Sequence, residues 1–426
     1  MTSLTDTDPA SDAVFRWRGV LLLVLAGAMS VVLLAGLGMR ALTEPGGTNS
    51  YALLADAFLH GRLYVTDCFD VDCAFYDGHN WVIFPPVPAV LAMPFVAVFG
   101  IGFSGFILLA IGATALALAL WWRILTRLSL GREAAVWLVL ALAFATPLYY
   151  VTIRADGVWF LAQTAAFLFV TIAIHEVVRG GSLVLAGAMI GLAMLCRQMS
   201  IFYLPFLFAL ALKPDEPLIS FRWPHWRRAL ALGLPVAAAL CVYFLYNYVR
   251  FGSPMDTGYG YMMPGPAGEE TMVDHRIADF GLFSSAYVLF NAMYLLVQGF
   301  HLQFGGVTMT VPEAMDSGGT SLLAASPFVL LAVFAPMRRA VVIGLMMIAV
   351  IAVPMLFYHS NGFTQYNAQR YTLDWLPILF VMLAFALRAQ EVRPNVPNGL
   401  VAALKVLVTY AVALNVVTMA MLALTT

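Results

Sequence analysis

Acidic side chains that could take a proton from an attacking group gather between residues 43 and 102. Asp56 stands within residues 50–61, where apolar residues recur at helical spacing and Gly61 supplies a stop signal. Four more carboxylates follow in the same segment: Asp67, Asp70, Asp72 and Asp77. A carboxylate within hydrogen-bond reach of a hydroxyl can act as its general base. The alternative for Asp56 is a solvated helix face.

Three arginines occur close to the ends of long apolar runs: Arg154, Arg197 and Arg370. A charge so near hydrocarbon is costly unless it is paired or hydrated, and therefore indicates function. The planar guanidinium also binds phosphate at two points, which a lysine cannot do. Asp156 lies two residues after Arg154 and belongs to the same group of outer charges. For Arg370 the alternative is an i, i+4 pair with Asp374 at the start of a helix.

Two of the four cysteines, Cys68 and Cys73, stand five positions apart in the first of these polar segments. If the segment faces an oxidising space outside a bacterial membrane, the pair predicts a small disulfide ring. A metal site is disfavoured, because His79 is the one further Cys or His nearby. Cys196 and Cys241 fall in apolar runs and are most simply core residues.

The elements that must position these residues are transmembrane helices. Hydrophobic residues make up 62% of the 426 positions and charged residues 11%, whereas soluble domains are about half apolar and a quarter charged. We therefore predict an all-α, polytopic bundle. The net charge of −1 and the lack of a basic block away from membrane-flanking positions argue against a nucleic-acid partner.

The order of the helices follows from charge, because Lys and Arg concentrate on the cytoplasmic side. Arg16 and Arg18 precede a long apolar run without a cleavage site, which predicts a retained first span and a cytoplasmic N-terminus. Two apolar segments, roughly 85–99 and 282–304, would break the charge pattern if they crossed. We expect both to be juxtamembrane or re-entrant helices on the outer face. About 11 crossings remain, near 19–42, 103–126, 133–153, 157–178, 182–196, 199–213, 229–249, 320–336, 340–358, 372–388 and 400–424.

This order places the C-terminus outside and makes residues 1–426 one transmembrane domain. Two long polar segments interrupt it on the outer face, residues 43–102 and 250–319. Long structured loops are usually functional, so the site is expected there. We expect a multi-pass protein of the bacterial inner membrane.

Several motifs occur in a fixed order along nearly the whole chain. They are the loop helix around Asp56, Phe84-Pro85-Pro86-Val87-Pro88-Ala89, Tyr246-Asn247-Tyr248 with Arg250-Phe251-Gly252, Gly281-Leu282-Phe283, and Arg370-Tyr371-Thr372-Leu373-Asp374-Trp375-Leu376-Pro377. In this order the chain resembles the GT-C glycosyltransferases, integral membrane enzymes. Each motif alone is weak, and the order makes the resemblance specific.

The resemblance implies an inverting transfer of a sugar from a polyprenyl-phosphate donor to a glycan, lipid or protein acceptor on the outer face. It assigns the general base to a carboxylate of the first outer loop, here Asp56, with Asp77 and Asp72 in reserve. Arg370, Arg197 and Arg154 are the candidates for holding the donor phosphate. A divalent metal is not expected to be required. Further candidate substrate-binding residues are Tyr51, His79, Arg250, Tyr259, His359, Gln365 and Tyr366.

The chain departs from the family where many members carry an acidic residue or an Asp-Glu pair before the first loop helix. That stretch reads Gly46-Gly47-Thr48-Asn49 here. A catalytically inactive partner subunit of the same fold is therefore an alternative. A lipid or solute transporter is a second one, although no internal repeat is visible and mid-span charges are few.

Overall fold

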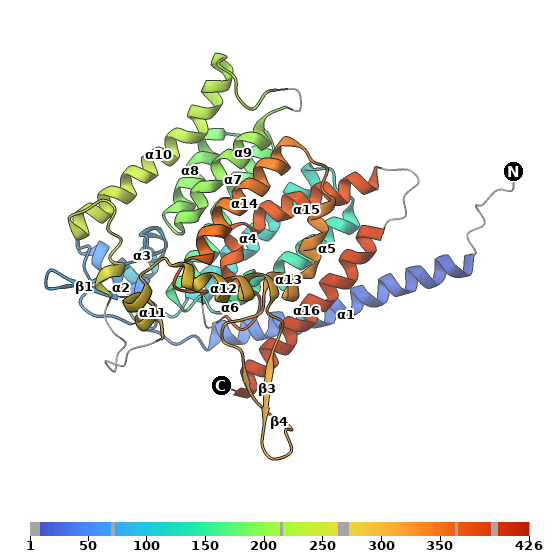
Figure 1. The fold of residues 1–426 in the computed structure, drawn as a ribbon, viewed down its shortest axis with the longest axis horizontal. Coiled ribbons are helices and arrows are strands. Elements are labelled where there is room, and N and C mark those ends of the chain that lie inside the picture. Colours follow the sequence, from blue (N-terminus) through green and yellow to red (C-terminus); the bar gives the residue numbers. More distant parts are fainter. Residues whose placement is uncertain are drawn as a thin grey trace.

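The computed structural model describes residues 9–69, 73–213, 216–262, 272–362, 365–392 and 399–425. They form a bundle of helices, and the expected fold class, a polytopic transmembrane helix bundle, is confirmed (Figure 1). Six helices of the described chain are long and apolar enough to cross a membrane. They are α1 (Pro9–Leu42), α4 (Phe106–Arg127), α7 (Val158–Val178), α10 (Trp223–Phe251), α14 (Arg339–Leu356) and α16 (Gly399–Thr425).

The expected count of about 11 spans is not confirmed. A seventh span arises if α5 (Arg132–Phe144) and α6 (Pro147–Ile153), bent by 44° at their junction, count as one. Pro147 explains the break, because it has no N–H to donate to the preceding turn, and Thr146 caps the new helix.

Shorter helical pieces occupy the other expected crossings. Apolar composition alone did not reveal that the backbone hydrogen-bond ladder breaks within or close to these segments. The pieces are α8 (Leu183–Met194), η1 (Gln198–Phe202) with α9 (Tyr203–Ala211), α13 (Leu322–Ala325) with η5 (Pro327–Phe334), and α15 (Leu376–Glu391).

Small helices and two hairpins lie at one end of the bundle. The helices are α2 (Ser50–Leu59), α3 (Val87–Phe99), η2 (Tyr259–Tyr261), α11 (Met272–Phe280), η3 (Ser285–Tyr287), α12 (Val288–Ala292), η4 (Met293–Val297) and η6 (Arg370–Asp374). The sequence predicted α3 well, but the helix expected over 282–304 ends at Val297. The two antiparallel hairpins were not predicted: β1 (Cys73–Tyr76) with β2 (His79–Val82), and β3 (Leu302–Gly305) with β4 (Val311–Met315).

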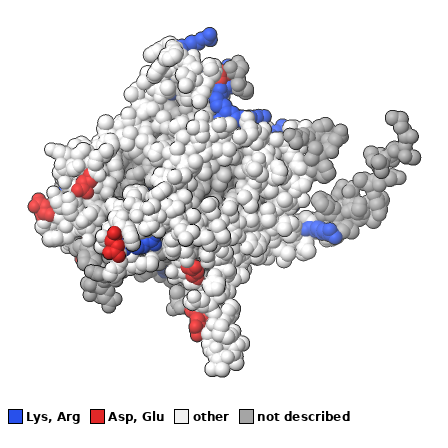
Figure 2. Space-filling view, viewed as in Figure 1, with Lys and Arg blue, Asp and Glu red and all other residues white. Residues whose placement is uncertain are grey.

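Charges separate along the molecule. On the face shown in Figure 2, Lys and Arg gather mainly near the start of α10, and Asp and Glu mainly near the end that carries β1, α11 and the β3–β4 hairpin. This separation is the one on which the expected orientation rests, with the acidic end outside.

Close helix packing fixes the part of the bundle that carries the site. At Gly187 of α8, a Cβ atom would lie 2.1 Å from the carbonyl oxygen of Leu232 on α10. Only glycine permits this approach, and small residues allow membrane helices to pack closely. The segment that follows α8 is thereby held against α10, and it delivers Arg197.

Candidate active site

The three arginines predicted to bind phosphate lie in one row, alternating with aromatic rings. The Cζ atoms of Arg154 and Arg370 lie 5.6 and 4.9 Å from the ring centroid of Phe160. Those of Arg370 and Arg197 lie 5.2 and 5.3 Å from the centroid of Tyr371. We call Arg154, Arg370 and Arg197 the arginine row. The face of an aromatic ring attracts a guanidinium group electrostatically, so such contacts orient the arginine side chains without neutralising their charge.

Carboxylates neutralise both ends of the row. The Nε and Nη2 atoms of Arg197 donate to the two carboxylate oxygens of Asp374, at 3.2 and 2.6 Å. At the other end, Asp156 accepts from Arg40 at 2.5 Å, and its second oxygen lies 3.9 Å from Nε of Arg154. The bidentate pair shows that Asp374 holds Arg197 in a fixed orientation.

The middle arginine, Arg370, is buried and donates to neutral groups. Its Nε and Nη2 atoms donate to the carbonyl of Gly362 at 3.0 and 2.6 Å. The amide oxygen of Gln365 accepts from the backbone N–H of Arg370 at 2.8 Å. Gln365, which the sequence suggested as a substrate-binding residue, therefore holds the backbone of Arg370, and the ring centroids of Tyr366 and Tyr150 lie 6.5 Å apart beside the row.

Arg197 stays charged although only 21% of its side chain is exposed. Desolvation lowers the pKa of a buried guanidinium, but the Asp374 carboxylate outweighs this and raises the pKa of Arg197 above its usual value. Its Nη1 atom donates to none of the residues that the structure describes. One edge of this arginine is therefore fixed by Asp374, and the other is available to an anion.

Tyrosines surround the Arg197–Asp374 pair, and three predicted substrate-binding residues lie among them. Tyr51 of α2 is fully buried and close enough to Arg197 and Tyr259 to be affected by them electrostatically. His359 lies 4.1 Å from the ring of Tyr358 and 6.4 Å from that of Tyr259. We call this region the tyrosine chamber.

Two titratable groups of the chamber, His359 and Tyr51, are uncharged near neutral pH. Burial, followed by the positive charge of Arg276, lowers the pKa of His359 to about 4. Burial raises the pKa of Tyr51 well above its usual value. Both side chains can thus donate or accept hydrogen bonds without carrying charge.

The carboxylate favoured by the sequence, Asp56, lies apart from the chamber on the same helix. Its side chain is 32% exposed, and its carboxylate lies 3.5 Å from both Arg62 and His60. Five residues separate Asp56 from Tyr51, which places the two about 140° apart around the helix axis. Tyr51 points into the chamber, so Asp56 faces another direction.

The reserve carboxylates lie in or near the β1–β2 hairpin. Asp77 and Gly78 form its turn, both at positive φ, and Asp77 and His79 are exposed. A left-handed Asp-Gly pair is typical of a two-residue hairpin turn. Asp72 lies outside the described residues. The structure therefore brings neither Asp77 nor His79 to the arginine row, and His79 stacks on Tyr64 at 4.2 Å.

Arg250 is buried at the end of α10 and contacts the first outer loop. It donates to the carbonyl of Val82 at 2.8 Å and to the side chain of Asn247 at 2.9 Å. Its guanidinium also lies 3.8 Å from the ring centroid of Tyr246. These contacts tie strand β2 to α10, next to the chamber.

Cys68 and Cys73, the pair expected from the sequence, are joined by a disulfide, with their Cα atoms 6.2 Å apart. It links the segment before β1 to Cys73, the first residue of that strand. Within the described part of the chain, no group of three or more His, Cys, Asp or Glu residues could hold a metal ion.

Asp156 had no separate role in the sequence analysis, and the structure places it at the Arg154 end of the row. Asp156 is 8% exposed, and its Oδ1 atom has no hydrogen-bond partner in the described chain. Two residues of the stretch that departs from the family pattern contact this part of the backbone. Thr48 donates to the carbonyl of Asp156, at 3.5 Å, and Asn49 donates to the carbonyl of Ala155, at 3.2 Å. Its signal in the sequence was its charge next to hydrocarbon.

Glu44, in the same outer segment, has a different role. Its two carboxylate oxygens accept from the backbone N–H groups of Phe106 and Ile107, each at 2.9 Å. The N-cap position of α4 supplies no side-chain cap. Glu44 therefore accepts hydrogen bonds from backbone N–H groups that have no partner within the helix, and its negative charge interacts favourably with the helix dipole. Burial raises the pKa of Glu44, and these amides oppose the shift.

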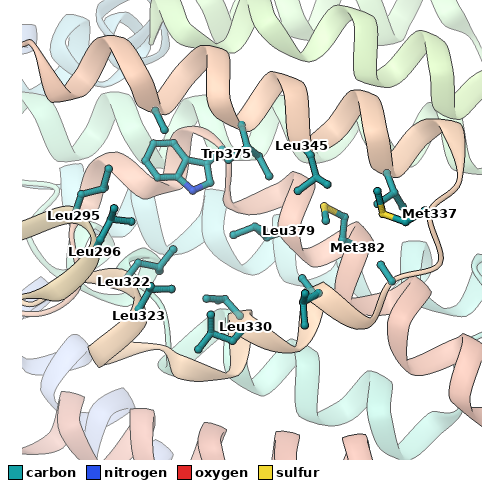
Figure 3. Close-up of a pocket in the computed structure, with 17 residues that line it drawn as sticks. Leu295, Leu296, Leu322, Leu323, Leu330, Met337, Leu345, Trp375, Leu379 and Met382 are labelled. Atoms are coloured by element: carbon teal, nitrogen blue, oxygen red, sulfur yellow. The ribbon is translucent and has the colours of Figure 1, made fainter. Parts of the chain in front are cut away.

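An apolar cavity of about 530 Å³ leads to the row. Leu345 of α14, Leu379 and Met382 of α15 and other apolar side chains line it. Figure 3 shows these side chains between Met337 at one end and Trp375 with Leu295 at the other. Trp375 directly follows Asp374, so the cavity ends beside the polar site. A hydrocarbon chain fits such a lining, because apolar walls offer no partner to polar groups.

Known proteins resemble the chain in sequence over one segment. The model of the dolichyl-phosphate-mannose-protein mannosyltransferase family matches residues 84–243, which is less than half of the chain. This match confirms the resemblance to GT-C membrane glycosyltransferases drawn from the sequence motifs. No relative was found among curated protein sequences.

Three solved structures resemble the whole fold at low sequence identity. ArnT from Cupriavidus metallidurans bound to undecaprenyl phosphate has a TM-score of 0.49 at 17% identity, over 95% of this chain and 76% of that one. The same protein in the apo state gives 0.45 at 18%, over 97% and 76%. The apo oligosaccharyltransferase of Archaeoglobus fulgidus gives 0.40 at 15%, over 94% and 56%. No TM-score reaches 0.5, so these likenesses add nothing about the site.

Proposed function

From the resemblance to GT-C glycosyltransferases, we propose that the protein transfers a sugar from a polyprenyl-phosphate donor to an acceptor on the outer face of the membrane. One observation carries the proposal: Trp375 lines the apolar cavity and directly follows Asp374, the carboxylate that pairs with Arg197 of the arginine row. A polyprenyl-phosphate sugar has a hydrocarbon tail joined to an anion, and this junction offers both surfaces side by side.

The phosphate is assigned to the arginine row. Arg370 lies at its centre, and Arg197 has a free Nη1 edge directed away from Asp374. Arg154 completes the row on the other side of Phe160. Three guanidiniums against two carboxylates, Asp374 and Asp156, leave a positive balance for a phosphate to neutralise.

In the proposed reaction the acceptor hydroxyl attacks the anomeric carbon of the donor sugar, and the bond from that carbon to the phosphate oxygen breaks. The proton of the hydroxyl passes to a carboxylate, and the phosphate leaves with the bonding electron pair. Attack from the face opposite the phosphate inverts the anomeric configuration. Positive charge at the row stabilises the departing phosphate.

Two carboxylates compete for the role of base. Asp56 is the base proposed from the sequence, and its partial exposure on α2 allows a hydroxyl from outside to reach it. Asp156 is the base favoured by position, because it lies at the row and its Oδ1 atom accepts no hydrogen bond from any described residue. Asp77 and Asp72 remain in reserve.

Paired substitutions distinguish them. Asp56→Asn and Asp156→Asn keep the shape of the side chain and remove its basicity, so the true base loses on the order of 10²–10⁴ in turnover while donor binding survives. The other variant should stay within about threefold of wild type. Transfer is measured with an undecaprenyl-phosphate sugar and a membrane extract as acceptor, on variants that elute as folded protein in detergent.

Each outcome has a consequence. If both variants keep the wild-type rate, neither is the base, and Asp77→Asn and Asp72→Asn follow. If wild type transfers from no polyprenyl-linked donor, the inactive-subunit alternative replaces the proposed activity. The identity of the acceptor, whether glycan, lipid or protein, is open to the same extract-based assay.

The protein is a multi-pass membrane protein, and we propose the bacterial inner membrane with the N-terminus inside and the C-terminus outside. The separation of charges between the two ends supports this orientation. Cysteines placed at positions 225 and 56, in a background without Cys68 and Cys73, test it with an impermeant thiol reagent on intact cells. Labelling of position 56 alone is expected. Labelling of position 225 alone would show that the protein has the opposite orientation in the membrane.

A further inference from the structure

Buried hydroxyls without partners gather in the tyrosine chamber. The hydroxyl oxygens of Tyr51, Tyr203 and Tyr246 and the Nδ1 atom of His359 accept or donate no hydrogen bond within the described residues. All four side chains are at least nine-tenths buried. A buried polar group without a partner costs about 1–3 kcal/mol, so four in one region indicate a binding surface.

Ring contacts and electrostatic influence place these groups in one region with the Arg197–Asp374 pair. Tyr51 is affected electrostatically by Tyr246 and Arg197, and Tyr203 by Asp374. They come from different elements, Tyr51 from α2, Tyr203 from α9, Tyr246 from α10 and His359 from the segment after α14. The chamber is therefore built by the tertiary fold, and it shares Arg197 with the arginine row.

The chamber offers many hydrogen bonds and little net charge. Phenol hydroxyls both donate and accept, and a neutral imidazole nitrogen accepts. The charged groups described at its centre, Arg197 and Asp374, are joined to each other at two points. Two further arginines lie at its margin: Arg250 donates to neutral groups beside Tyr246, and Arg276 lies over the rings of Tyr287 and Phe290. An added positive charge would be repelled by these arginines, and an added negative charge would find each guanidinium already hydrogen-bonded, stacked on an aromatic ring or assigned to phosphate.

We propose that the chamber binds the sugar of the donor, and that this sugar is an uncharged one, a neutral hexose or pentose. The proposal rests on the proposed function, because it assumes a donor with its phosphate at the arginine row. Sugar hydroxyls supply the donors and acceptors that Tyr51, Tyr203, Tyr246 and His359 require. An ammonium or a carboxylate on the sugar would be desolvated without compensation.

Three donors that differ mainly in charge test the proposal: undecaprenyl-phosphate-linked glucose, glucuronic acid and glucosamine. We expect kcat/KM for the glucose donor to exceed those for the two charged donors by at least about tenfold, because a buried unpaired charge is costly. Equal or faster transfer from a charged donor overturns the inference and leaves the proposed function intact. Transfer from none of the three donors and from no other polyprenyl-linked hexose or pentose overturns the proposed function, and this inference with it.

Phenol substitutions give a second, independent readout. Tyr51→Phe and Tyr246→Phe should each raise KM for the glucose donor about two- to tenfold, the usual worth of one neutral hydrogen bond. Their thermal stability should be unchanged, since these hydroxyls have no partner in the described protein. An unchanged KM in both variants contradicts the inference.

Tyr149→Phe is the matched control. Tyr149 is also a buried tyrosine, but its hydroxyl donates to the carbonyl of Leu33 at 2.9 Å, away from the chamber. Its loss should lower Tm and leave KM within about twofold of wild type. A Tyr149→Phe effect on KM as large as those at Tyr51 and Tyr246 would show that the chamber tyrosines act through general stability.

Discussion

The first outer loop and the segment from His359 to Asp374 are both rich in polar side chains, yet they differ in burial. In the first loop Asp56 is 32% exposed in its side chain, and Asp77 and His79 are exposed. In the later segment Gln365 and Arg370 are 0% and 4% exposed. Burying polar groups is costly unless the fold compensates them. The later segment therefore carries the stronger signal of a site, although the first loop has the denser cluster of carboxylates.

Arg370 gives the largest expected effect in the later segment. Arg370→Ala should lower kcat/KM for a polyprenyl-phosphate sugar about 100-fold or more, because it removes a buried charge from the phosphate site. Arg370→Lys should recover only part of this loss, since lysine lacks the planar fork. The measurement is transfer kinetics together with donor binding in detergent.

Arg179→Ala serves as the control for Arg370. Arg179 is also an ion-paired arginine, 2.6 Å from Glu176, but it lies at the C-terminal end of α7, the opposite end from Arg154 and Phe160. Its kcat/KM should stay within about threefold of wild type. Wild-type donor binding by Arg370→Ala would remove the arginine row from the mechanism and restore the first loop as the principal candidate.

His359 tests whether the later segment is buried in solution. Its pKa is lowered from 6.5 to about 4, mainly by burial, so the folded state resists protonation. Its contribution to stability is complete above about pH 6.5 and is lost as pH falls toward 4, up to about 3 kcal/mol. As the pH is lowered from 7 to 4, the Tm of wild type should therefore fall more steeply than the Tm of His359→Gln.

The two pH profiles are compared in one detergent and at one ionic strength. Parallel profiles would mean that His359 titrates normally and is hydrated. The difference in burial between the two regions would then not hold at His359.

The disulfide of the first loop gives the smallest expected effect. Loss of a bridge that closes a six-residue ring should cost about 2 kcal/mol at most, confined to the β1–β2 hairpin. Cys68→Ser with Cys73→Ser should therefore leave turnover within about threefold, as expected for a loop that stands apart from the row. Mass spectrometry of alkylated wild-type protein should show the two peptides linked, and two free thiols would contradict the bridge.

The sequence by itself determined the class of the fold and suggested most of the residues of the proposed site. Composition alone predicts a membrane bundle, because a chain with so few charges can bury its surface only in lipid. The charges nearest to hydrocarbon, Arg154, Arg197 and Arg370, could be selected without a structure for the same reason. The pair Cys68 and Cys73 followed from spacing and compartment.

Only the tertiary structure decided how these residues are combined. Helix breaks such as the one at Pro147 reduce the count of long spans, and apolar composition does not show them. Asp374 pairs with Arg197, 177 positions away, rather than with its close sequence neighbour Arg370. Phe160 and Tyr371 join three distant arginines into one row. The burial of Asp156 and of the chamber hydroxyls is likewise visible only in the structure. Burial and hydrogen-bond satisfaction depend on tertiary packing, and a local pattern of residues does not show them.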